Sequence, residues 1–185
     1  MSKVELADIV CSIARTVGIV GERWTPLILR DLFLGITRFE DLRRDLGIAS
    51  NVLTDRLRTL REHEIVETRV YQDNPVRTEY ILTDRGRDLY PVLTMLLAWG
   101  DRWLSTPDGP PLSVVHRDCD HLTEGVVVCH HCGDPITADN VTWHPGPGGR
   151  PGPGVALIGE RLTPLPGQRP GLPPAAVSPE DQRPD

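Results

Sequence analysis

The stretch of residues 47–83, GIASNVLTDRLRTLREHEIVETRVYQDNPVRTEYILT, changes its hydrophobic period partway along. Up to about Ile65 the apolar residues recur every three or four positions, which predicts an amphipathic helix. From Val66 they recur nearer to every second position, which is typical of strands, and Asp73-Asn74-Pro75 divides this run in two. The stretch therefore predicts a helix followed by a two-stranded ribbon, with strands at about residues 66–72 and 76–82.

Two helices are predicted near the N-terminus. Thr25 can cap a helix that has Pro26 at its first position, and Gly35 is a typical terminator of that helix. An earlier helix, ended by Gly18 and Gly21, is predicted by apolar residues spaced as on one helix face: Leu6, Ile9, Val10, Ile13 and Val17.

A pair of helices joined by a short turn directly precedes the ribbon. Thr37 and Glu40 have the spacing of a capping box and predict a short helix that ends at Gly47. Ser50 is the natural cap of the next helix, which runs to about His63. Two helices joined by a turn of about four residues that contains glycine are typical of a helix-turn-helix.

The second helix of this pair has two distinct faces. Leu53, Leu57 and Leu60 fall on one stripe, which must pack against the core. The opposite face carries four polar residues, with Thr54 at its flank: Asn51, Asp55, Arg58 and Glu62. Asparagine can pair with adenine and arginine with guanine in the major groove of DNA, so this face is a candidate reading surface. The alternative is a solvated amphipathic helix beside an ordinary hairpin.

The ribbon would act as the wing of a winged helix. Gln72, Asn74 and Arg77 lie near its predicted tip, where they could reach phosphate or the minor groove. The candidate DNA-binding residues are Ser50, Asn51, Thr54, Asp55, Arg58, Asn74 and Arg77.

The last helix is predicted to begin after the capping residue Thr83 and to run to about Leu104, with a kink at Pro91. Its apolar residues cover too much of its circumference for one small domain to bury: Leu89, Val92, Leu93, Leu96, Leu97, Trp99 and Trp103. We expect a two-fold interface here, because a winged helix needs two half-sites for useful specificity. The alternative is that the segment after this helix covers it.

Several motifs follow one another in an order that resembles a known family. They are Cys11, Gly21-Glu-Arg-Trp24-Thr-Pro-Leu-Ile-Leu29, Gly35-Ile-Thr-Arg-Phe39, Leu53-Thr-Asp-Arg-Leu57, Pro75-Val-Arg-Thr-Glu-Tyr80-Ile-Leu-Thr83, Gly86 and Trp99-Gly100. This pattern, spread over about residues 8–104, resembles the HxlR family of bacterial winged-helix transcriptional regulators. The resemblance implies a dimer, built by the first and last helices, that binds a pseudo-palindromic operator.

The resemblance also implies that Cys11 could sense oxidants or electrophiles. The alternative for a lone cysteine on an amphipathic helix is a small buried apolar residue. The sequence departs from the family pattern at Ser12, where proline is common, and at Glu64, where glycine usually ends the recognition helix. Asp55 is an acidic residue on the reading face. It could accept a hydrogen bond from cytosine, orient Arg58, or face solvent.

Residues 107–144 form a Cys/His-rich segment. His116 and Cys119 form one pair, and Cys129 and Cys132 form a Cys-x-x-Cys pair further on. Four such ligands predict a closed structural zinc site of zinc-ribbon type. Three further histidines leave the ligand set open: His121, His130 and His131. The competing interpretations are a redox disulfide between the two cysteines of the second pair and a hairpin without metal.

The composition limits the remaining possibilities. The net charge is −6, so DNA would be bound by a local face and not by bulk charge. Over residues 38–77 eight arginines are balanced by eight aspartates and glutamates. The chain has no apolar run of membrane-spanning length and no signal-peptide pattern at its start, so we expect no membrane partner and a cytoplasmic, nucleoid-associated protein. Residues 145–185 contain 11 prolines and 8 glycines, which predicts a disordered tail.

We therefore predict a mainly α fold with a small β-wing (α+β). Its parts are a winged helix-turn-helix domain at residues 5–105, a zinc-ribbon-like appendage at 107–144 and the tail at 145–185. The predicted function is that of a dimeric repressor that binds an inverted-repeat operator in double-stranded DNA and responds to a thiol-reactive agent or a ligand. The motifs of common enzymes are missing. The alternatives are a thiol oxidoreductase that uses Cys129 and Cys132, and a protein-interaction adaptor.

Overall fold

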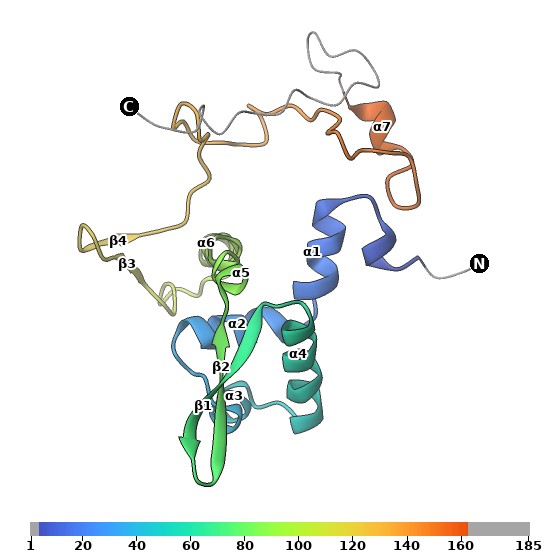
Figure 1. Ribbon diagram of the computed structural model, residues 1–185. Coiled ribbons are helices and arrows are strands. Elements are labelled where there is room, and N and C mark those ends of the chain that lie inside the picture. Colours follow the sequence, from blue (N-terminus) through green and yellow to red (C-terminus); the bar gives the residue numbers. More distant parts are fainter. Residues whose placement is uncertain (1–3, 163–185) are drawn as a thin grey trace. The chain divides into compact units, whose positions relative to one another are not determined.

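The computed structural model describes residues 4–162. In it, a helix ends and a β-hairpin begins near Ile65, where the hydrophobic period of the sequence changes (Figure 1).

The chain divides into two compact units. One is formed by residues 17–136, and the other by the described parts of residues 1–16 and 137–185. Helix α1 (Ser12–Val20) runs across the division. The predicted winged helix, apart from its first residues, lies in the larger unit.

Three helices and a hairpin form the core of this larger unit. Their bounds are α2 Thr25–Phe33, α3 Phe39–Leu46, α4 Ser50–Glu62, β1 Val66–Asp73 and β2 Val76–Leu82. The strands pair antiparallel, from Val66 opposite Leu82 to Asp73 opposite Val76. Their apolar faces meet in one buried cluster: Ile28, Leu29, Leu32, Leu42, Ile48, Leu53, Leu57, Leu60, Ile65, Val66 and Leu82. The predicted α+β class and both predicted strands are confirmed.

Helices α3 and α4 form the predicted helix-turn-helix. The turn begins at Gly47, whose φ of 63° lies in the left-handed region that glycine adopts at little cost. The three leucines predicted to face the core are buried, with exposed fractions of 0%, 1% and 0% for Leu53, Leu57 and Leu60. Helix α4 is therefore anchored along one side only.

The side-chain caps predicted at the starts of these helices are wrong. The N-cap positions are Trp24, Arg38 and Ala49, and none of them makes a side-chain capping bond. Thr25 and Ser50 are the first helical residues, and Thr37 donates its hydroxyl hydrogen to Glu79 Oε2 at 2.7 Å. The hydroxyl of Thr37 thus makes a contact with β2 in place of the local capping bond.

The first predicted helix is broken in two. A 3-10 turn (η1, Leu6–Asp8) precedes α1, and the two are separated where Ile9 takes an extended conformation with ψ of 130°. The apolar spacing that predicted one continuous helix therefore spans a break.

The last predicted helix is also divided, into α5 (Asp84–Arg87) and α6 (Tyr90–Leu104). Thr83 caps α5 by accepting a hydrogen bond from the Gly86 N–H at 3.1 Å. Pro91 lies in the first turn of α6, where backbone N–H groups have no partner within the helix, so its lack of an N–H costs no hydrogen bond. The kink predicted at Pro91 is wrong, because a new helix begins there. The ring of Tyr90 meets that of Phe33 edge-on, with ring centres 5.1 Å apart, and joins α6 to α2.

A tight turn joins α4 to β1. Glu64 has a φ of 56°, a left-handed conformation that residues other than glycine rarely adopt. Gly86 packs against the same turn, because a Cβ at that position would lie 2.2 Å from the Ile65 carbonyl oxygen. The glutamate at position 64 therefore adopts the backbone geometry for which glycine is suited.

An arginine bridge ties α2 to α3. The Arg30 guanidinium donates two hydrogen bonds to Asp31 Oδ1, at 2.8 and 2.6 Å, and one to Asp45 Oδ2 at 3.2 Å. Asp31 is buried, and its Oδ2 has no hydrogen-bond partner among residues 4–162. Burial raises the pKa of Asp31, against the lowering effect of Arg30. The bridge fixes the helix that leads into α4.

The Cys/His-rich segment packs against one side of α6. It contains a second antiparallel hairpin, β3 (Val114–His116) paired with β4 (His121–Thr123). A hollow between the helix and the segment is lined by residues of both, which include Thr94, Leu97, Ala98 and Asp101 from α6 and Pro110, Leu112, Val114, Leu122 and Gly125 from the segment. The interpretation that this segment covers α6 therefore holds for one side of the helix.

The smaller unit is described for residues 4–16 and 137–162. Val155 is buried, and a Cβ on Gly154 would lie 2.9 Å from the Ile9 side chain. A short helix, α7 (Ile158–Arg161), follows. The rest of the predicted disordered tail, residues 163–185, lies outside the described residues. Between residues 4 and 162 no helix is long and apolar enough to cross a membrane.

Candidate DNA interface

The side of α4 opposite its leucines is exposed. Ser50, Asn51 and Thr54 are exposed at its N-terminal end, and its first turn contains no acidic residue. The partial positive charge of the helix N-terminus is therefore not offset by a carboxylate in that turn. Such an end attracts phosphate groups.

Asp55 holds Arg58 on this exposed side. Arg58 Nη2 donates a hydrogen bond to Asp55 Oδ1 at 2.8 Å, and Arg58 Nε lies 3.9 Å from Glu62 Oε1. The Arg58 side chain remains 63% exposed. Of the three roles considered for Asp55, the structure supports the one in which it orients Arg58.

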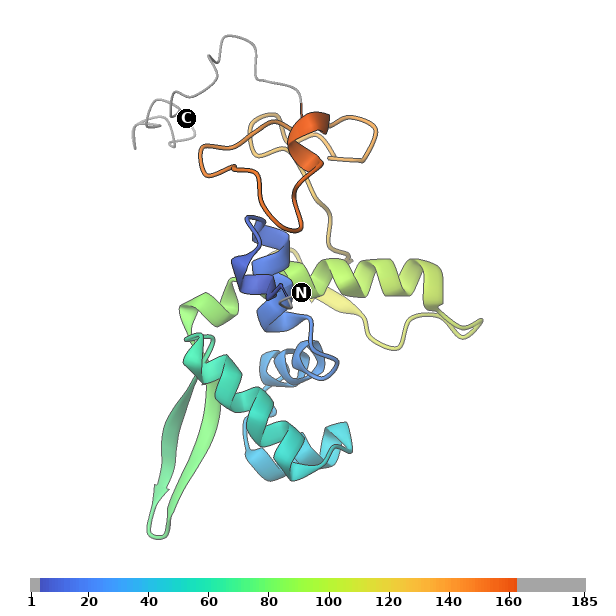
Figure 2. The same cartoon turned by 90° about the vertical axis from the view of Figure 1, so that its right-hand side faces the viewer.

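The hairpin β1–β2 projects beyond the helices in both ribbon views (Figures 1 and 2). Asn74 lies at its tip, where Gln72 Nε2 donates a hydrogen bond to the Asn74 carbonyl oxygen at 3.1 Å. Arg77 is exposed beside it and takes part in no ion pair within the described residues. The structure thus places the three predicted wing residues together at the tip.

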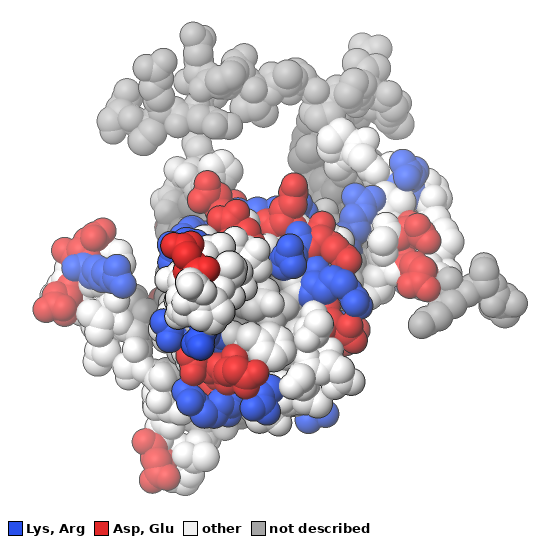
Figure 3. Space-filling model, turned by 60° about the horizontal axis from the view of Figure 1, so that its bottom comes forward, with Lys and Arg blue, Asp and Glu red and all other residues white. Residues whose placement is uncertain are grey.

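Most arginines around the helix-turn-helix are paired with carboxylates. The pairs are Arg43 with Glu40, Arg44 with Asp41, Arg56 with Glu22, and Arg69 with Glu79. Figure 3, which brings forward the lower end of the molecule in Figure 1, shows blue and red side chains next to each other on this face. The face is locally neutral, as the count of charges predicts, so any contact with DNA would rest on individual arginines.

The contacts that fix the wing to the helix-turn-helix have no signal in the sequence. Thr37, just before α3, donates to Glu79 from its hydroxyl and accepts a hydrogen bond from the Tyr80 N–H at 2.8 Å on its carbonyl oxygen. Arg69 donates two hydrogen bonds to the other oxygen of Glu79, at 3.0 and 2.8 Å. The hydrogen bond from Thr37, followed by that from Arg69, lowers the pKa of Glu79. These residues set where the wing lies relative to α4.

The predicted zinc ligands are grouped as two pairs. His116 Nδ1 lies 3.3 Å from Cys119 Sγ, and Cys129 lies next to Cys132 in a second turn. All four cysteines are free thiols, so no disulfide joins Cys129 to Cys132. In the described part of the chain, no three or more His, Cys, Asp or Glu side chains form a group that could hold a metal ion.

Cys11 is half-buried and directly precedes α1. Its carbonyl oxygen accepts a hydrogen bond from the Arg15 N–H at 3.1 Å, so its backbone belongs to the first turn of that helix. The two exposed apolar residues of α1, Ile13 and Val17, follow closely. Ile13 and Val17 share one side of α1, and the helical spacing places Cys11 on another side.

A helix-turn-helix with an exposed second helix and a projecting hairpin defines the class of winged helix-turn-helix proteins. Comparison with known families matches residues 19–108 to the HxlR-like helix-turn-helix. The chain belongs to this family of transcriptional regulators, as the sequence motifs predicted.

Curated proteins and solved structures support this assignment. The HTH-type transcriptional regulator Rv3095 of Mycobacterium tuberculosis is 46% identical over 137 residues, which are 74% of this chain and 87% of that protein. The crystal structure of PA1607, a candidate transcription factor, has a TM-score of 0.67 and 34% identity and covers 75% of this chain and 96% of its own. PA1374 of Pseudomonas aeruginosa, also a candidate transcription factor, has a TM-score of 0.53 and 32% identity over 82% of this chain and 100% of its own.

The mycobacterial match extends past the family domain. Because it covers 137 of 185 residues, it contains residues 49–137 wherever it begins. The Cys/His-rich segment up to residue 137 is therefore within the part of the chain that this regulator matches. Regulation of transcription is the function these relatives share by name, which favours it over the oxidoreductase and adaptor interpretations.

Proposed function

We propose that the chain binds an inverted-repeat operator as a homodimer and represses transcription by occupying it. The observation that carries this proposal is the two-sided geometry of α4. Its leucines are buried, while Asn51, Thr54 and Arg58 are exposed on the other side. A helix anchored in this way can enter the major groove without disturbing the core.

Arg58 is suited to read guanine. A guanidinium has five N–H donors, and Asp55 takes one of them, so two parallel donors remain for the O6 and N7 atoms of the base. Holding the side chain in place before binding reduces the conformational entropy lost on contact. Thr54 and Asn51, about one and two turns nearer the helix start, would meet neighbouring base edges, and Ser50 would contact a phosphate.

The wing adds contacts that do not depend on sequence. Arg77 has no carboxylate partner in the described residues, so it can pair with a phosphate without breaking an ion pair. Asn74 at the tip offers its side-chain amide to the backbone or the minor groove. These contacts would set the position of α4 in the groove.

A second copy of the chain is proposed to cover the outer side of α6. Four residues at intervals of four, three and four form one stripe there: Val92, Leu96, Trp99 and Trp103, with exposed fractions of 43%, 56%, 59% and 67%. This stripe lies on the side of the helix opposite the one that the Cys/His-rich segment covers. An uncovered stripe of large apolar side chains on a regulator that needs two half-sites fits a two-fold interface.

Selection of bound DNA from a random pool tests the function. We expect recovery of an inverted repeat whose half-sites are separated by about one helical turn, or about 10 base pairs. Enrichment of a single half-site would contradict the dimer, and no enrichment at all would contradict the operator.

Substitution in the α6 stripe tests the dimer separately. Trp99→Glu places a charge in the proposed interface, so the variant should sediment as a monomer and lose most of its affinity for the inverted repeat. Arg102→Ala, an exposed residue of the same helix outside the stripe, is the control. A Trp99→Glu protein that remains dimeric would remove α6 from the interface.

Cys11 is proposed as the site of a thiol response. Its carbonyl oxygen accepts the first hydrogen bond of α1, so modification of the thiol would act on the first turn of that helix. Operator binding should be titrated with diamide in the parent and in Cys11→Ser. Equal loss of binding in the two proteins would exclude Cys11 from the response.

A further inference from the structure

Two turns in the Cys/His-rich segment have the same backbone geometry. In the first, the Asp120 N–H donates to the His116 carbonyl oxygen at 2.8 Å, and Asp120 has a φ of 57°. In the second, the Gly133 N–H donates to the Cys129 carbonyl oxygen at 2.8 Å, and Gly133 has a φ of 76°. Each turn therefore carries metal-ligand residues at its first and fourth positions and a left-handed residue at its fifth.

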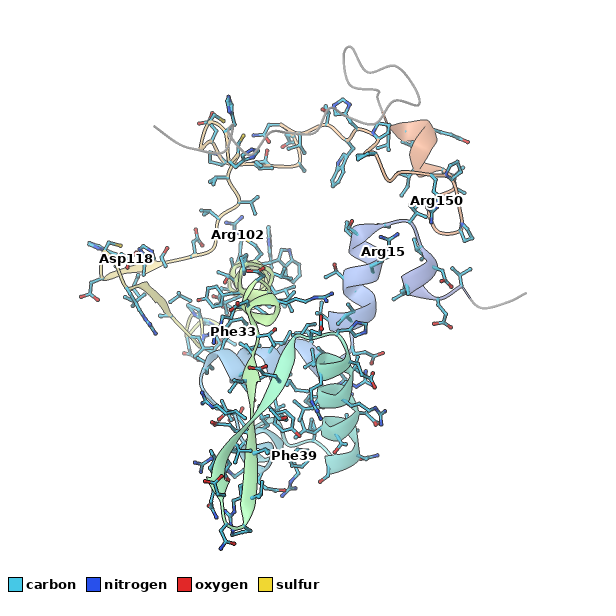
Figure 4. The ribbon with its side chains drawn as sticks, in the orientation of Figure 1. Arg15, Phe33, Phe39, Arg102, Asp118 and Arg150 are labelled. Carbon is cyan, nitrogen blue, oxygen red and sulfur yellow. The ribbon has the colours of Figure 1, made fainter. Side chains whose placement is uncertain are left out.

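Each turn closes a hairpin. His116 and His121 are the last pair of β3 and β4, and Asp118 marks the tip between them (Figure 4). Around the second turn the Cys129 N–H donates to the Asp134 carbonyl oxygen at 2.8 Å, and Val128 pairs with Pro135. A hairpin tip of this kind presents its first and fourth side chains toward the same point.

The atoms of the first pair are spaced for one ion. His116 Nδ1 and Cys119 Sγ are 3.3 Å apart. Zn–N and Zn–S bonds of roughly 2.1 and 2.3 Å in a tetrahedron put two such ligands roughly 3.5 Å apart. The His121 ring nitrogen instead contacts the Cys119 carbonyl oxygen. This contact favours His116 over His121 as the histidine ligand.

The second pair lies in a turn of the same kind. The backbone N–H groups of Cys132 and His131 point at the Cys129 sulfur, and the Cys132 side chain lies within hydrogen-bonding reach of it. The sulfurs of Cys129 and Cys132 are therefore close enough to bind the same ion. The thiols of Cys119 and Cys132 are exposed, and that of Cys129 is half-buried.

Apolar burial does not hold this segment together. No residue between positions 107 and 136 is buried, and large apolar side chains such as Leu122 and Val126 are 72% and 69% exposed. Small units with so little core are commonly held by a crosslink or a structural metal. The segment nevertheless belongs to the part matched by the mycobacterial regulator.

We propose that His116, Cys119, Cys129 and Cys132 bind one zinc ion per chain, and that the ion draws the two hairpin tips together. The donor set of one imidazole and three thiolates is that of a closed structural zinc site. As described, the structure keeps the tips as two pairs, so joining them is the step that the metal would drive. The thiols lose their protons on binding, and no oxidant or reductant takes part.

Native mass spectrometry of the reduced full-length chain, purified without a histidine tag and titrated with zinc, tests the proposal. We expect one zinc per chain, which means two zinc ions on the dimer and one on any monomer in the same spectrum. Cys119→Ser and Cys129→Ser should each lower zinc affinity at least 100-fold, while Cys11→Ser and His121→Ala should bind as the parent does. Less than one zinc per chain in the parent would overturn the site. Parent-like binding by Cys119→Ser would also overturn it, because the first turn would then supply no ligand.

Two further readouts identify the ligands and their connection. Cobalt substituted for zinc should give the intense thiolate charge-transfer absorption of three sulfur ligands, reduced by about a third in each cysteine variant. Zinc bound by dimers beside metal-free monomers in the same spectrum would overturn a site made within one chain. A failure of zinc binding in a chain that still selects an operator would leave the proposed function intact.

Discussion

The core of the winged helix and residues 107–136 of the Cys/His-rich segment lie in the same unit but are held together in different ways. The winged helix buries an apolar cluster in which Ile28, Leu42, Leu53 and Leu60 are each 0% exposed. The segment of residues 107–136 buries no residue and is ordered by hydrogen-bonded turns and by its contact with α6. A core confers stability through many non-directional contacts, whereas local turns fix geometry and leave cohesion to a crosslink.

This difference separates two kinds of function in one chain. The rigid unit can hold α4 and the wing at a fixed spacing, which reading of DNA requires. If the segment beside it binds zinc as proposed, the metal would rearrange the segment while the core persists. We therefore expect substitutions in the core to change the stability of the fold. Substitutions in the exposed face of α4 should change DNA binding alone, and those in the two turns should change zinc binding alone.

The largest expected effect is on the core. Leu57→Ala should lower the free energy of unfolding by about 2–5 kcal/mol, because it leaves a cavity in a cluster where this side chain is 1% exposed. Leu122→Ala, the same substitution at a residue that is 72% exposed in β4, should change it by less than about 0.5 kcal/mol. Urea denaturation followed by circular dichroism measures both. Similar losses in the two variants would mean that the segment shares the core's stability.

The next effect is on DNA reading. Arg58→Ala should cost about 1–3 kcal/mol of operator binding and relax preference at one position in each half-site. Fluorescence anisotropy with the selected operator and with single-base variants measures this loss. Parent-like affinity at matched salt would show that Arg58 does not read bases.

Two controls distinguish base recognition from contact with phosphate and from zinc binding. Arg77→Ala should weaken operator and random DNA by the same factor and reduce the salt dependence of binding, because its contact is with phosphate. A zinc chelator should leave operator affinity within about twofold, because α4 and the wing are held by the core. Loss of operator binding on chelation, with the fold intact, would instead make the segment a metal sensor for the winged helix.

A smaller effect is expected at the turn between α4 and β1. Glu64→Gly should raise the free energy of unfolding by about 0.5–1 kcal/mol, because glycine adopts the φ of 56° without the steric cost that glutamate bears. Glu62→Gly, at the last residue of α4, should lower it by up to about 1 kcal/mol, because glycine is a poor helix former. Thermal denaturation of the two variants shows whether each one is more or less stable than the parent. A lower free energy of unfolding in both variants would mean that position 64 does not favour glycine.

The smallest effect is a pH dependence at the base of the wing. The hydrogen bonds from Thr37 and Arg69 lower the pKa of Glu79 below its ordinary value of 4.5. Their contribution to stability is therefore present above pH 4.5 and is lost as the pH falls through the lowered pKa. The stability difference between the parent and Glu79→Gln should be constant near neutral pH and shrink on the acid side. NMR titration should show the pKa of Glu79 rising in Thr37→Val, and an unchanged value would contradict the role of that hydroxyl.

Local sequence patterns predicted the reading helix and the wing well. The leucines of α4 recur at helical spacing, and the alternation after Val66 ends at a proline-containing turn, so each element could be placed without knowledge of its partners. The predicted caps at Thr37 and Ser50 were wrong, because capping spacing says nothing about which distant group competes for the hydroxyl. The continuous helices predicted at both ends are broken for a similar reason: apolar spacing survives across Ile9 and Leu89 although the backbone turns there.

The sequence by itself determined the class of the protein, the side of α4 that faces the core, and the residue types available to DNA and metal. These follow from periodicity and chemistry within short stretches. Only the tertiary structure decided that Thr37 reaches Glu79 across 42 residues and that Arg30 reaches Asp45 across 15. Hydrogen bonds between distant residues and positive φ angles depend on where the whole chain brings each backbone segment, and no local pattern of residues encodes that position.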